Sequence, residues 1–263
     1  MAYESCGEGL PVVLLHANPG DHRDFDAILP ELAARHRVIA IDWPGYGESA
    51  PPRPAQSASA MLFADLLQEL VEGLGLGPAV FIGNSVGGFA AVRLAITHPQ
   101  KVRGLVLVSP GGFAEHNPLT WLFCQVRGRE WVTRLIAARF ARLYIKRRTE
   151  FTAPILERAG AEQRSASMVA VDAAVWRSFS NPGHDLRGQA GAISTPTLLI
   201  VGRHDPVIRA QVEGRKAAAL IPNATLAIPE TGHMPFAEDP RWFLDTVQPF
   251  LTKVGENHAP SHL

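Results

Sequence analysis

The sequence of 263 residues has few cysteines, no net charge and no long apolar run. Its two cysteines, Cys6 and Cys124, match no metal-site spacing and no disulfide framework, which favours two reduced thiols. A formal net charge of zero gives no overall attraction to nucleic acid or to an anionic membrane. The apolar runs are shorter than the roughly 18 residues of a membrane span, and no secretory leader pattern opens the sequence. We therefore expect a cytoplasmic protein with no nucleic-acid partner and no membrane span.

Short apolar runs alternate with helical patterns along most of the chain. Hydrophobic residues make up 46% and charged residues 19%, which is typical of a globular protein. Runs that are apolar throughout suit strands whose sheet is covered on both faces. The alternation predicts an α/β fold with a doubly wound, mainly parallel sheet. The expected strands are 11–17, 37–42, 79–84, 104–109, 195–202 and 224–230, and the expected helices are 61–73, 86–97, 209–220 and 240–252.

One interval, 112–190, interrupts this alternation, since it reads as helical and is too long for a plain loop. We interpret it as a helical cap inserted into a core domain formed by 1–111 and 191–255. The polar segment 256–263 is expected to be a frayed tail. Before Pro11 there is room for one short edge strand and a turn.

The segment "GNSVGG", residues 83–88, places Ser85 where an expected strand turns directly into an expected helix. Such a turn presents a serine hydroxyl clear of the backbone, and Gly83 and Gly87 allow the strand and the helix to approach closely. A packing turn without chemistry gives the same pattern. A serine nucleophile also needs a base that accepts its proton.

His233 and Asp205 are the candidates for that base and for an acid that orients it. Both follow expected strands, and the carboxyl ends of parallel strands are where such sheets build sites. An aspartate beside the imidazole would fix its tautomer and stabilise the imidazolium. The alternatives are a histidine that caps the next helix and an aspartate that acts as an N-cap, and the second role is compatible with the catalytic one. The order Ser85, Asp205, His233 is the one that an α/β-hydrolase requires.

Two backbone amides are candidates for an oxyanion site. Val86 opens the helix after Ser85, where an unpaired N–H group favours developing negative charge. The loop "HANPG" after the first expected strand brings the Asn18 amide toward the same edge of the sheet. Alternatively, the proline and glycine of this loop only shape it.

These motifs together resemble the α/β-hydrolase fold family over nearly the whole chain. The matching pieces are "LLHANPG", "VIAIDWPGYGES", "GNSVGGFAAVRLAITHPQKVRGLVLVSP", "LLIVGRHDPV" and "GHMPFAEDP". The resemblance implies Ser85 as nucleophile, His233 as base and Asp205 as acid. It also implies that the amides of Asn18 and Val86 form the oxyanion site. Asp42, Gly45 and Gly47 are then residues of a structural turn, and relatives usually carry more antiparallel strands at the first edge of the sheet.

The resemblance implies a serine hydrolase that cleaves a small carboxylic ester or lactone through an acyl-enzyme, without a cofactor. A C–C bond hydrolase of the same fold and a ligand-binding, receptor-like protein that retains the triad are the alternatives. A metal enzyme built on His16, His22 and His204 ranks last, because these residues lack a ligand spacing. The sequence leaves the oligomeric state open.

The expected cap combines aromatic and basic residues. The stretch from Arg127 to Arg148 carries eight basic residues against Glu130 alone, with Trp131, Leu135, Phe140 and Leu143 as a possible apolar face. A solvated helix face, attraction of an anionic substrate, and docking on an acidic partner or membrane surface all remain open. Six residues are candidates for the substrate pocket, although aromatic residues here also suit the core of a cap: Phe113, Trp121, Phe123, Trp131, Trp176 and Met234.

Overall fold

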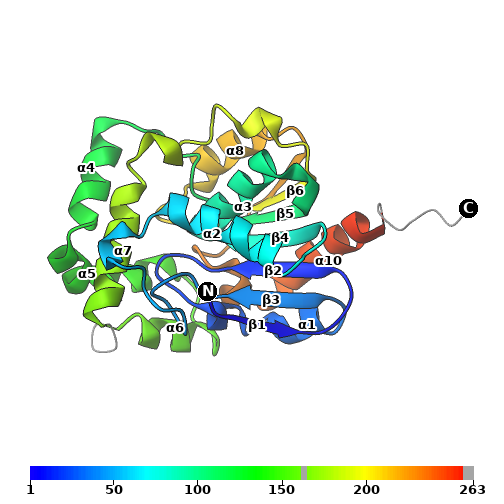
Figure 1. Ribbon diagram of the computed structural model, residues 1–263, viewed down its shortest axis with the longest axis horizontal. Coiled ribbons are helices and arrows are strands. Elements are labelled where there is room, and N and C mark those ends of the chain that lie inside the picture. Colours follow the sequence, from blue (N-terminus) through cyan, green and yellow to red (C-terminus); the bar gives the residue numbers. More distant parts are fainter. Residues whose placement is uncertain (161–164, 257–263) are drawn as a thin grey trace, which may run out of the picture.

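A sheet of seven strands forms the centre of the protein in the computed structural model (Figure 1), which describes residues 1–160 and 165–256. The strand order is β1-β3-β2-β4-β5-β6-β7; β1 pairs antiparallel with β3 and all other pairs are parallel. The α/β class and the mainly parallel sheet are thus confirmed. The strands are β1 (Tyr3–Cys6), β2 (Pro11–Leu15), β3 (Arg37–Ile41), β4 (Ala79–Asn84), β5 (Val102–Val108), β6 (Thr197–Ile200) and β7 (Ala224–Ala227).

The inner strands β2 to β6 are mostly apolar and buried because both faces of the sheet are covered there, whereas the edge strand β1 is largely exposed. Alternate residues of β2 enter two separate cores: Val13 and Leu15 belong to one, and Val12 and Leu14 belong to the other. Helices α2 (Ala60–Gly73), α3 (Val86–Thr97) and α8 (Arg215–Leu220) contribute to the first core. Helices α1 (Leu29–Ala33), α9 (Pro235–Glu238) and α10 (Pro240–Glu256) contribute to the second.

The expected helix 209–220 is not uniform, because it begins as a π-helical turn at Ala210–Gly214 before α8. The strand β1, which lies before Pro11, is the short edge strand for which the sequence has room. The expected frayed tail, 256–263, lies outside the described residues apart from Glu256, which ends α10. Short 3₁₀ turns lie at His22–Phe25, Ala55–Ser57, Pro99–Lys101, Pro182–His184 and Ala190–Ala192.

The insertion between β5 and β6 is helical and forms one end of the molecule, on the left in Figure 1. Its helix α7 lies against α4, α5 and the turn at Ala55–Ser57, so it is the central helix of the insertion. Within the two described ranges, none of the helices has the length and apolar character needed to cross a membrane. The helices of the insertion are α4 (Pro118–Arg127), α5 (Glu130–Tyr144), α6 (Thr152–Arg158) and α7 (Ala166–Ser178).

Candidate active site

Ser85 occupies the turn between β4 and α3 with a backbone conformation that side chains rarely adopt. Its φ is 54° and its ψ is −112°, so the turn holds a strained non-glycine residue. The strain is held in place because the Ser85 amide donates to the Val108 carbonyl at 2.9 Å and the Gly111 amide donates to the Ser85 carbonyl at 3.0 Å. The side chain is half-buried, and its hydroxyl makes no hydrogen bond within the described part of the chain.

The glycines around Ser85 are required by the close approach of three elements. A Cβ on Gly83 would lie 2.5 Å from the Gly87 carbonyl oxygen, and a Cβ on Gly87 would lie 2.3 Å from the Leu15 carbonyl oxygen. The end of β2 therefore touches the first turn of α3. This contact brings the loop after β2, which contains Asn18, to the edge of the sheet where Ser85 lies.

His233 and Asp205 form a buried hydrogen-bonded pair. His233 Nδ1 lies 2.6 Å from Asp205 Oδ2, and both residues are almost fully buried. Asp205 Oδ1 accepts from the amides of Val207 at 2.8 Å and Ile208 at 3.0 Å, so the carboxylate caps the following turn as well as contacting the imidazole. Burial by itself raises the pKa of Asp205, but the charge and hydrogen bond of His233, together with hydrogen bonds from Ser109 and the Ile208 amide, hold the pKa below its ordinary value.

Asn84 links the loop of His233 to the turn of Ser85. The Asn84 Nδ2 atom donates to the His233 carbonyl oxygen at 3.2 Å and to the Val108 carbonyl oxygen at 3.1 Å. Ser85 and His233 are thus brought to the same edge of the sheet, although no hydrogen bond joins the Ser85 hydroxyl to the His233 imidazole among the described contacts. The sequence pattern does not indicate a role for Asn84, because its buried position depends on strand pairing.

Tyr144, at the end of α5, lies directly on His233. The two rings stack with centroids 4.8 Å apart and planes at 28°, and the His233 amide donates to the Tyr144 carbonyl at 2.8 Å. A Cβ on Gly232 would lie 2.1 Å from the same carbonyl, so only glycine fits before His233. Burial raises the pKa of the Tyr144 phenol well above its ordinary value. Tyr144 is therefore a residue of the insertion that belongs to the site, and no sequence motif indicated it.

Glu238 fastens the loop of His233 to the insertion. Its Oε2 accepts from the amides of Gly232 (2.9 Å), Lys146 (2.8 Å) and Arg147 (2.8 Å), and its Oε1 accepts from the Met234 amide at 3.2 Å. The Glu238 side chain is buried. The segment "GHMPFAEDP" contains this residue, but the sequence pattern alone does not show that its carboxylate bridges two chain segments.

The side chain of Asn18 belongs to a buried polar network between the core and the insertion. Asn18 Nδ2 donates to Asp172 Oδ1 of α7 at 3.2 Å, and the Tyr46 hydroxyl donates to Asn18 Oδ1. Asp172 Oδ2 lies 3.5 Å from the Arg127 guanidinium of α4. Because its side chain is held in this way, the loop that carries the Asn18 amide has a fixed position. The Val86 amide, the first of α3, has no intrahelical acceptor.

A cavity of about 150 Å³ lies beside the site, between the core and the insertion. Tyr144 borders it and connects it to His233. The Arg158 guanidinium in its wall lies 2.8 Å from Asp24 Oδ1 and 3.3 Å from Asp21 Oδ2. Further lining residues are Pro19, Gly20, Tyr46, Ile145, Ile155 and Met234.

Of the six residues expected around the substrate, only Met234 is part of this cavity wall. Phe113 instead lies in the sheet core, and Trp176 is buried beneath the Arg127 guanidinium, 4.8 Å from the ring centroid. Trp121, Phe123 and Trp131 lie outside the cavity wall and are exposed to solvent by 55%, 47% and 63%. Periodicity identifies an aromatic face of a helix, but the packing of the insertion decides where that face points.

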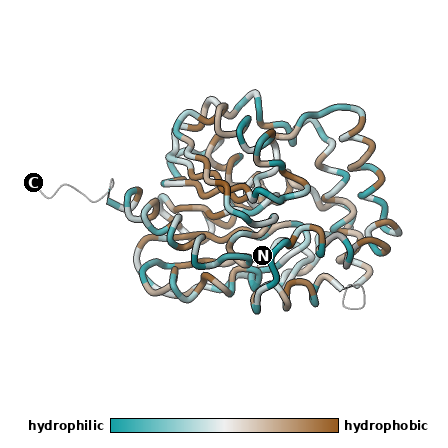
Figure 2. The backbone as a smooth tube through the Cα atoms, turned by 180° about the vertical axis from the view of Figure 1, so that it is seen from behind, coloured by the Kyte–Doolittle hydropathy of each residue, from teal (hydrophilic) through white to brown (hydrophobic). Residues whose placement is uncertain are grey.

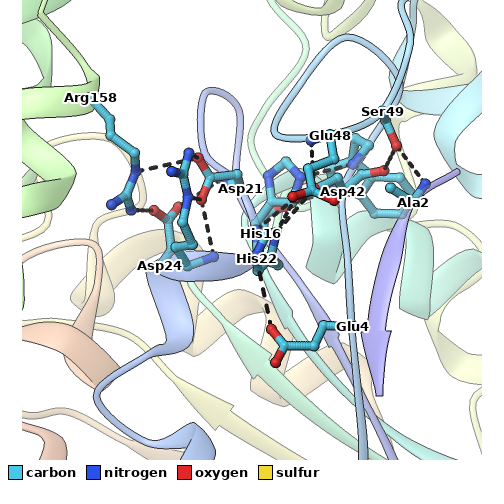
Figure 3. A network of polar contacts seen from close by, with 12 residues as sticks. Ala2, Glu4, His16, Asp21, His22, Asp24, Asp42, Glu48, Ser49 and Arg158 are labelled. Atoms are coloured by element: carbon cyan, nitrogen blue, oxygen red, sulfur yellow. Dashed lines mark hydrogen bonds and ion pairs between the residues drawn. The ribbon is translucent and has the colours of Figure 1, made fainter. Parts of the chain in front are cut away.

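The histidines considered for a metal site make structural contacts, and Figure 3 shows two of them, His16 and His22, in a polar network around Asp42. The Trp43 amide donates to His16 Nε2 at 2.9 Å, and burial lowers the pKa of His16 to about 4, so this ring is neutral. His22 Nδ1 contacts the Asp42 carboxylate at 3.0 Å, and His204 contacts Glu230 at 3.1 Å. Three metal-binding side chains do not converge anywhere in the described ranges.

The turn after β3 has the structural role that its glycines indicate. The Asp42 carboxylate accepts from the amides of His22 at 2.8 Å and Glu48 at 2.9 Å. A Cβ on Gly47, whose φ is +50°, would lie 2.2 Å from this carboxylate. Asp42 and Gly47 therefore shape the loop that meets the Ser85 edge.

Comparisons with known proteins agree with the architecture. A family model described as the alpha/beta hydrolase fold matches residues 11–240. A dihydrolipoyllysine-residue acetyltransferase component of the acetoin cleaving system from Pseudomonas putida is 30% identical over 88% of this chain, which spans 61% of that relative's length. A thermophilic esterase from Thermogutta terrifontis is 28% identical with a TM-score of 0.81, covering 97% of this chain and 93% of its own.

A second solved structure, Est816, described as an N-acyl homoserine lactone degrading enzyme, is 26% identical with a TM-score of 0.78. The match covers 95% of this chain and 96% of that one. The family model spans most of the sequence, and it includes the turn of Ser85, the strand before Asp205 and the loop of His233. The resemblance noted in the sequence is confirmed: this chain belongs to the α/β-hydrolase fold family.

Proposed function

We propose that the protein is a serine hydrolase that cleaves a carboxylic ester or a lactone through an acyl-enzyme. Ser85 is the nucleophile, His233 the general base and Asp205 the acid that orients it. The observation that carries this proposal is the buried 2.6 Å contact between His233 and Asp205, in which the loop of His233 is also hydrogen-bonded to Asn84, the residue before Ser85. The positive φ of Ser85 supports it, because strain at a half-buried serine is typical of a nucleophile turn.

In the first half-reaction, the Ser85 oxygen attacks the carbonyl carbon while its proton passes to His233 Nε2. The amides of Asn18 and Val86 stabilise the negative charge on the former carbonyl oxygen. The imidazolium then gives its proton to the leaving alcohol oxygen as the C–O bond breaks. The contact between the hydroxyl and the imidazole, which is absent here among the described hydrogen bonds, is of the kind that tightens when a substrate binds.

In the second half-reaction, His233 takes a proton from water, whose oxygen attacks the acyl carbon. The bond to Ser85 breaks, the serine recovers its proton from His233, and the acid leaves. With a lactone, the alcohol and the acid are two ends of one product. The esterase and the lactone-degrading enzyme among the similar structures support these two substrate classes.

The direct test is labelling with a serine-reactive fluorophosphonate, followed by a panel of aryl esters and lactones. We expect wild type to be labelled at Ser85, and Ser85→Ala to lose both the label and at least roughly 10³-fold of kcat. Ser57→Ala is the matched control, because Ser57 is exposed and its hydroxyl donates to the nearby Pro54 carbonyl. Labelling that persists in Ser85→Ala, or full activity of that variant, would refute the proposal.

A further inference from the structure

Helix α4 exposes its apolar stripe to solvent. Leu119, Leu122, Phe123 and Val126 recur at the spacing of one helical face, and they are exposed by 76%, 52%, 47% and 41%. A surface helix of a globular protein normally turns such a stripe toward the core. In α4 a different face is buried, and its buried residues are Cys124 and the charged Arg127. The outward direction of the stripe is thus a feature of the fold.

Helix α5 continues the apolar surface. Trp131, Leu135 and Leu143 are exposed by 63%, 67% and 62%. Phe140, which the sequence placed on the same face, lies outside the described side chains. The hydropathy colouring of the insertion shows apolar segments interleaved with polar ones on its outer helices (Figure 2). Eight of the twelve exposed large apolar side chains of the described residues lie on α4 and α5, two helices in contact with each other, so exposed apolar area is concentrated on this part of the insertion.

Exposed basic side chains are interleaved with this surface. Between residues 127 and 148, the acid-paired basic groups within the described ranges are Arg127, with Asp172, and Arg147, with Asp239. Glu130 is the single acidic residue of the stretch. Since the protein as a whole has no net charge, this end of the molecule is locally cationic. The other basic residues of the stretch, all exposed, are Arg129, Arg134, Arg139, Arg142, Lys146 and Arg148.

We propose that this outer face of α4 and α5, the cap face, docks on the surface of an anionic lipid bilayer. Leucine, phenylalanine and tryptophan side chains favour the boundary between headgroups and acyl chains, and arginines bind the anionic headgroups. A face that exposes both apolar and cationic side chains therefore matches the surface of an anionic bilayer. A second copy of the chain fits less well, because a symmetric contact would bring two cationic faces together.

Docking is measured by co-sedimentation with vesicles, using the full chain. We expect binding to vesicles of equal parts phosphatidylglycerol and phosphatidylcholine, and on the order of tenfold weaker binding to phosphatidylcholine alone. Added salt should weaken the binding to anionic vesicles toward the phosphatidylcholine value. The proposal does not depend on the catalytic roles, so the Ser85→Ala variant should bind like wild type.

Two double variants separate the apolar and the charged contributions. Leu122→Glu with Phe123→Glu, and Arg139→Gln with Arg142→Gln, should each lower the affinity for anionic vesicles on the order of tenfold or more. Leu220→Glu and Arg241→Gln are the matched controls, because both side chains are exposed away from α4 and α5. All the substituted side chains are exposed, so the variants should fold like wild type.

Three outcomes would overturn the proposal. The first is no binding of wild type to anionic vesicles. The second is equal binding by both double variants and wild type. The third is a concentration-dependent dimer in solution that is abolished by Leu122→Glu with Phe123→Glu, since the cap face would then be an interface between copies of the chain.

Discussion

Asn84 and His233 are joined directly: the Asn84 side-chain amide donates to the His233 carbonyl oxygen at 3.2 Å. Asn84 is the last residue of β4 and precedes Ser85, while His233 follows β7. The strands are not neighbours in the sheet, since β5 and β6 lie between them. A single buried side chain therefore connects two loops that strand pairing alone does not connect.

This link predicts the effect of Asn84→Ala. Two carbonyl oxygens lose a donor, and we expect a loss of about 1 to 3 kcal/mol of unfolding free energy, measured by chemical denaturation. If His233 acts as the base, its displacement should also lower kcat by roughly tenfold or more with a smaller change in KM. Asn223→Ala, which removes an exposed bond to the Ser194 carbonyl, is the control. Unchanged kcat and fluorophosphonate labelling rate in Asn84→Ala would contradict the positioning role.

The hydrogen bonds of Glu238 predict that two substitutions at this position destabilise the protein to different extents. In Glu238→Gln the side-chain oxygen can keep the place of Oε2 and its three amide donors, while the amide nitrogen faces the Met234 amide. In Glu238→Ala all four donors lose their acceptor. We expect the alanine variant to lose about 2 to 4 kcal/mol of stability and the glutamine variant less, because unsatisfied buried donors are costly. Equal destabilisation by both variants, in denaturation curves, would show that hydrogen bonding is not the cause.

The close approach at the Ser85 turn predicts opposite outcomes for two glycines. Gly83→Ala places a Cβ within 2.6 Å of Gly87 and Gly88 backbone atoms, so we expect a loss of about 3 kcal/mol or more and reduced activity. Gly77→Ala meets no atom within 4 Å and should be neutral or slightly stabilising. The thermal midpoints of both variants test this. A Gly83→Ala variant as stable as wild type would mean that the turn relaxes freely.

Much of the fold was predictable from local patterns. The six expected strands were found because parallel strands covered on both faces read as continuous apolar runs bounded by glycine, proline, aspartate or asparagine. Ser85, Asp205 and His233 were found as candidates because each ends or follows such a run. Their catalytic roles remain predictions. The sequence suggested two roles for Asp205, an N-cap and a partner of the imidazole. The structure is compatible with both, since one carboxylate oxygen caps a turn and the other contacts the His233 ring.

The insertion was less predictable, because its contacts are not local in sequence. Tyr144 lies on His233 across 89 residues of chain, and Glu238 joins its own loop to Lys146 and Arg147. The spacing of the apolar residues along α4 does not indicate that its apolar stripe faces outward. That direction follows from the buried pair of Arg127 and Asp172, which occupies the inward side. The sequence therefore indicated a helical insertion, but the surroundings of the aromatic side chains of α4 depend on packing between distant segments.

The carboxyl group of Asp24 gives a pH-dependent prediction. Burial, together with the neighbouring Asp21, raises the pKa of Asp24 to about 7, although Arg158 of α6 pairs with it. An unfolded aspartate titrates near pH 4. Between about pH 4 and about pH 7 the native state therefore holds a proton that the unfolded state has lost. By linkage, the contribution of this group to stability falls as the pH rises through that window, and the deficit persists above it.

Asp24→Asn removes this titration while keeping the shape of the side chain. We expect wild type to lose more unfolding free energy than Asp24→Asn between about pH 5 and about pH 8, by at most roughly 3 kcal/mol. Asp65→Asn, on the exposed face of α2, should follow wild type. The measurement is the unfolding free energy of all three proteins at both pH values. If Asp24→Asn shows the same loss as wild type, then Arg158 holds Asp24 ionised throughout, and the pair is an ordinary salt bridge between the core and the insertion.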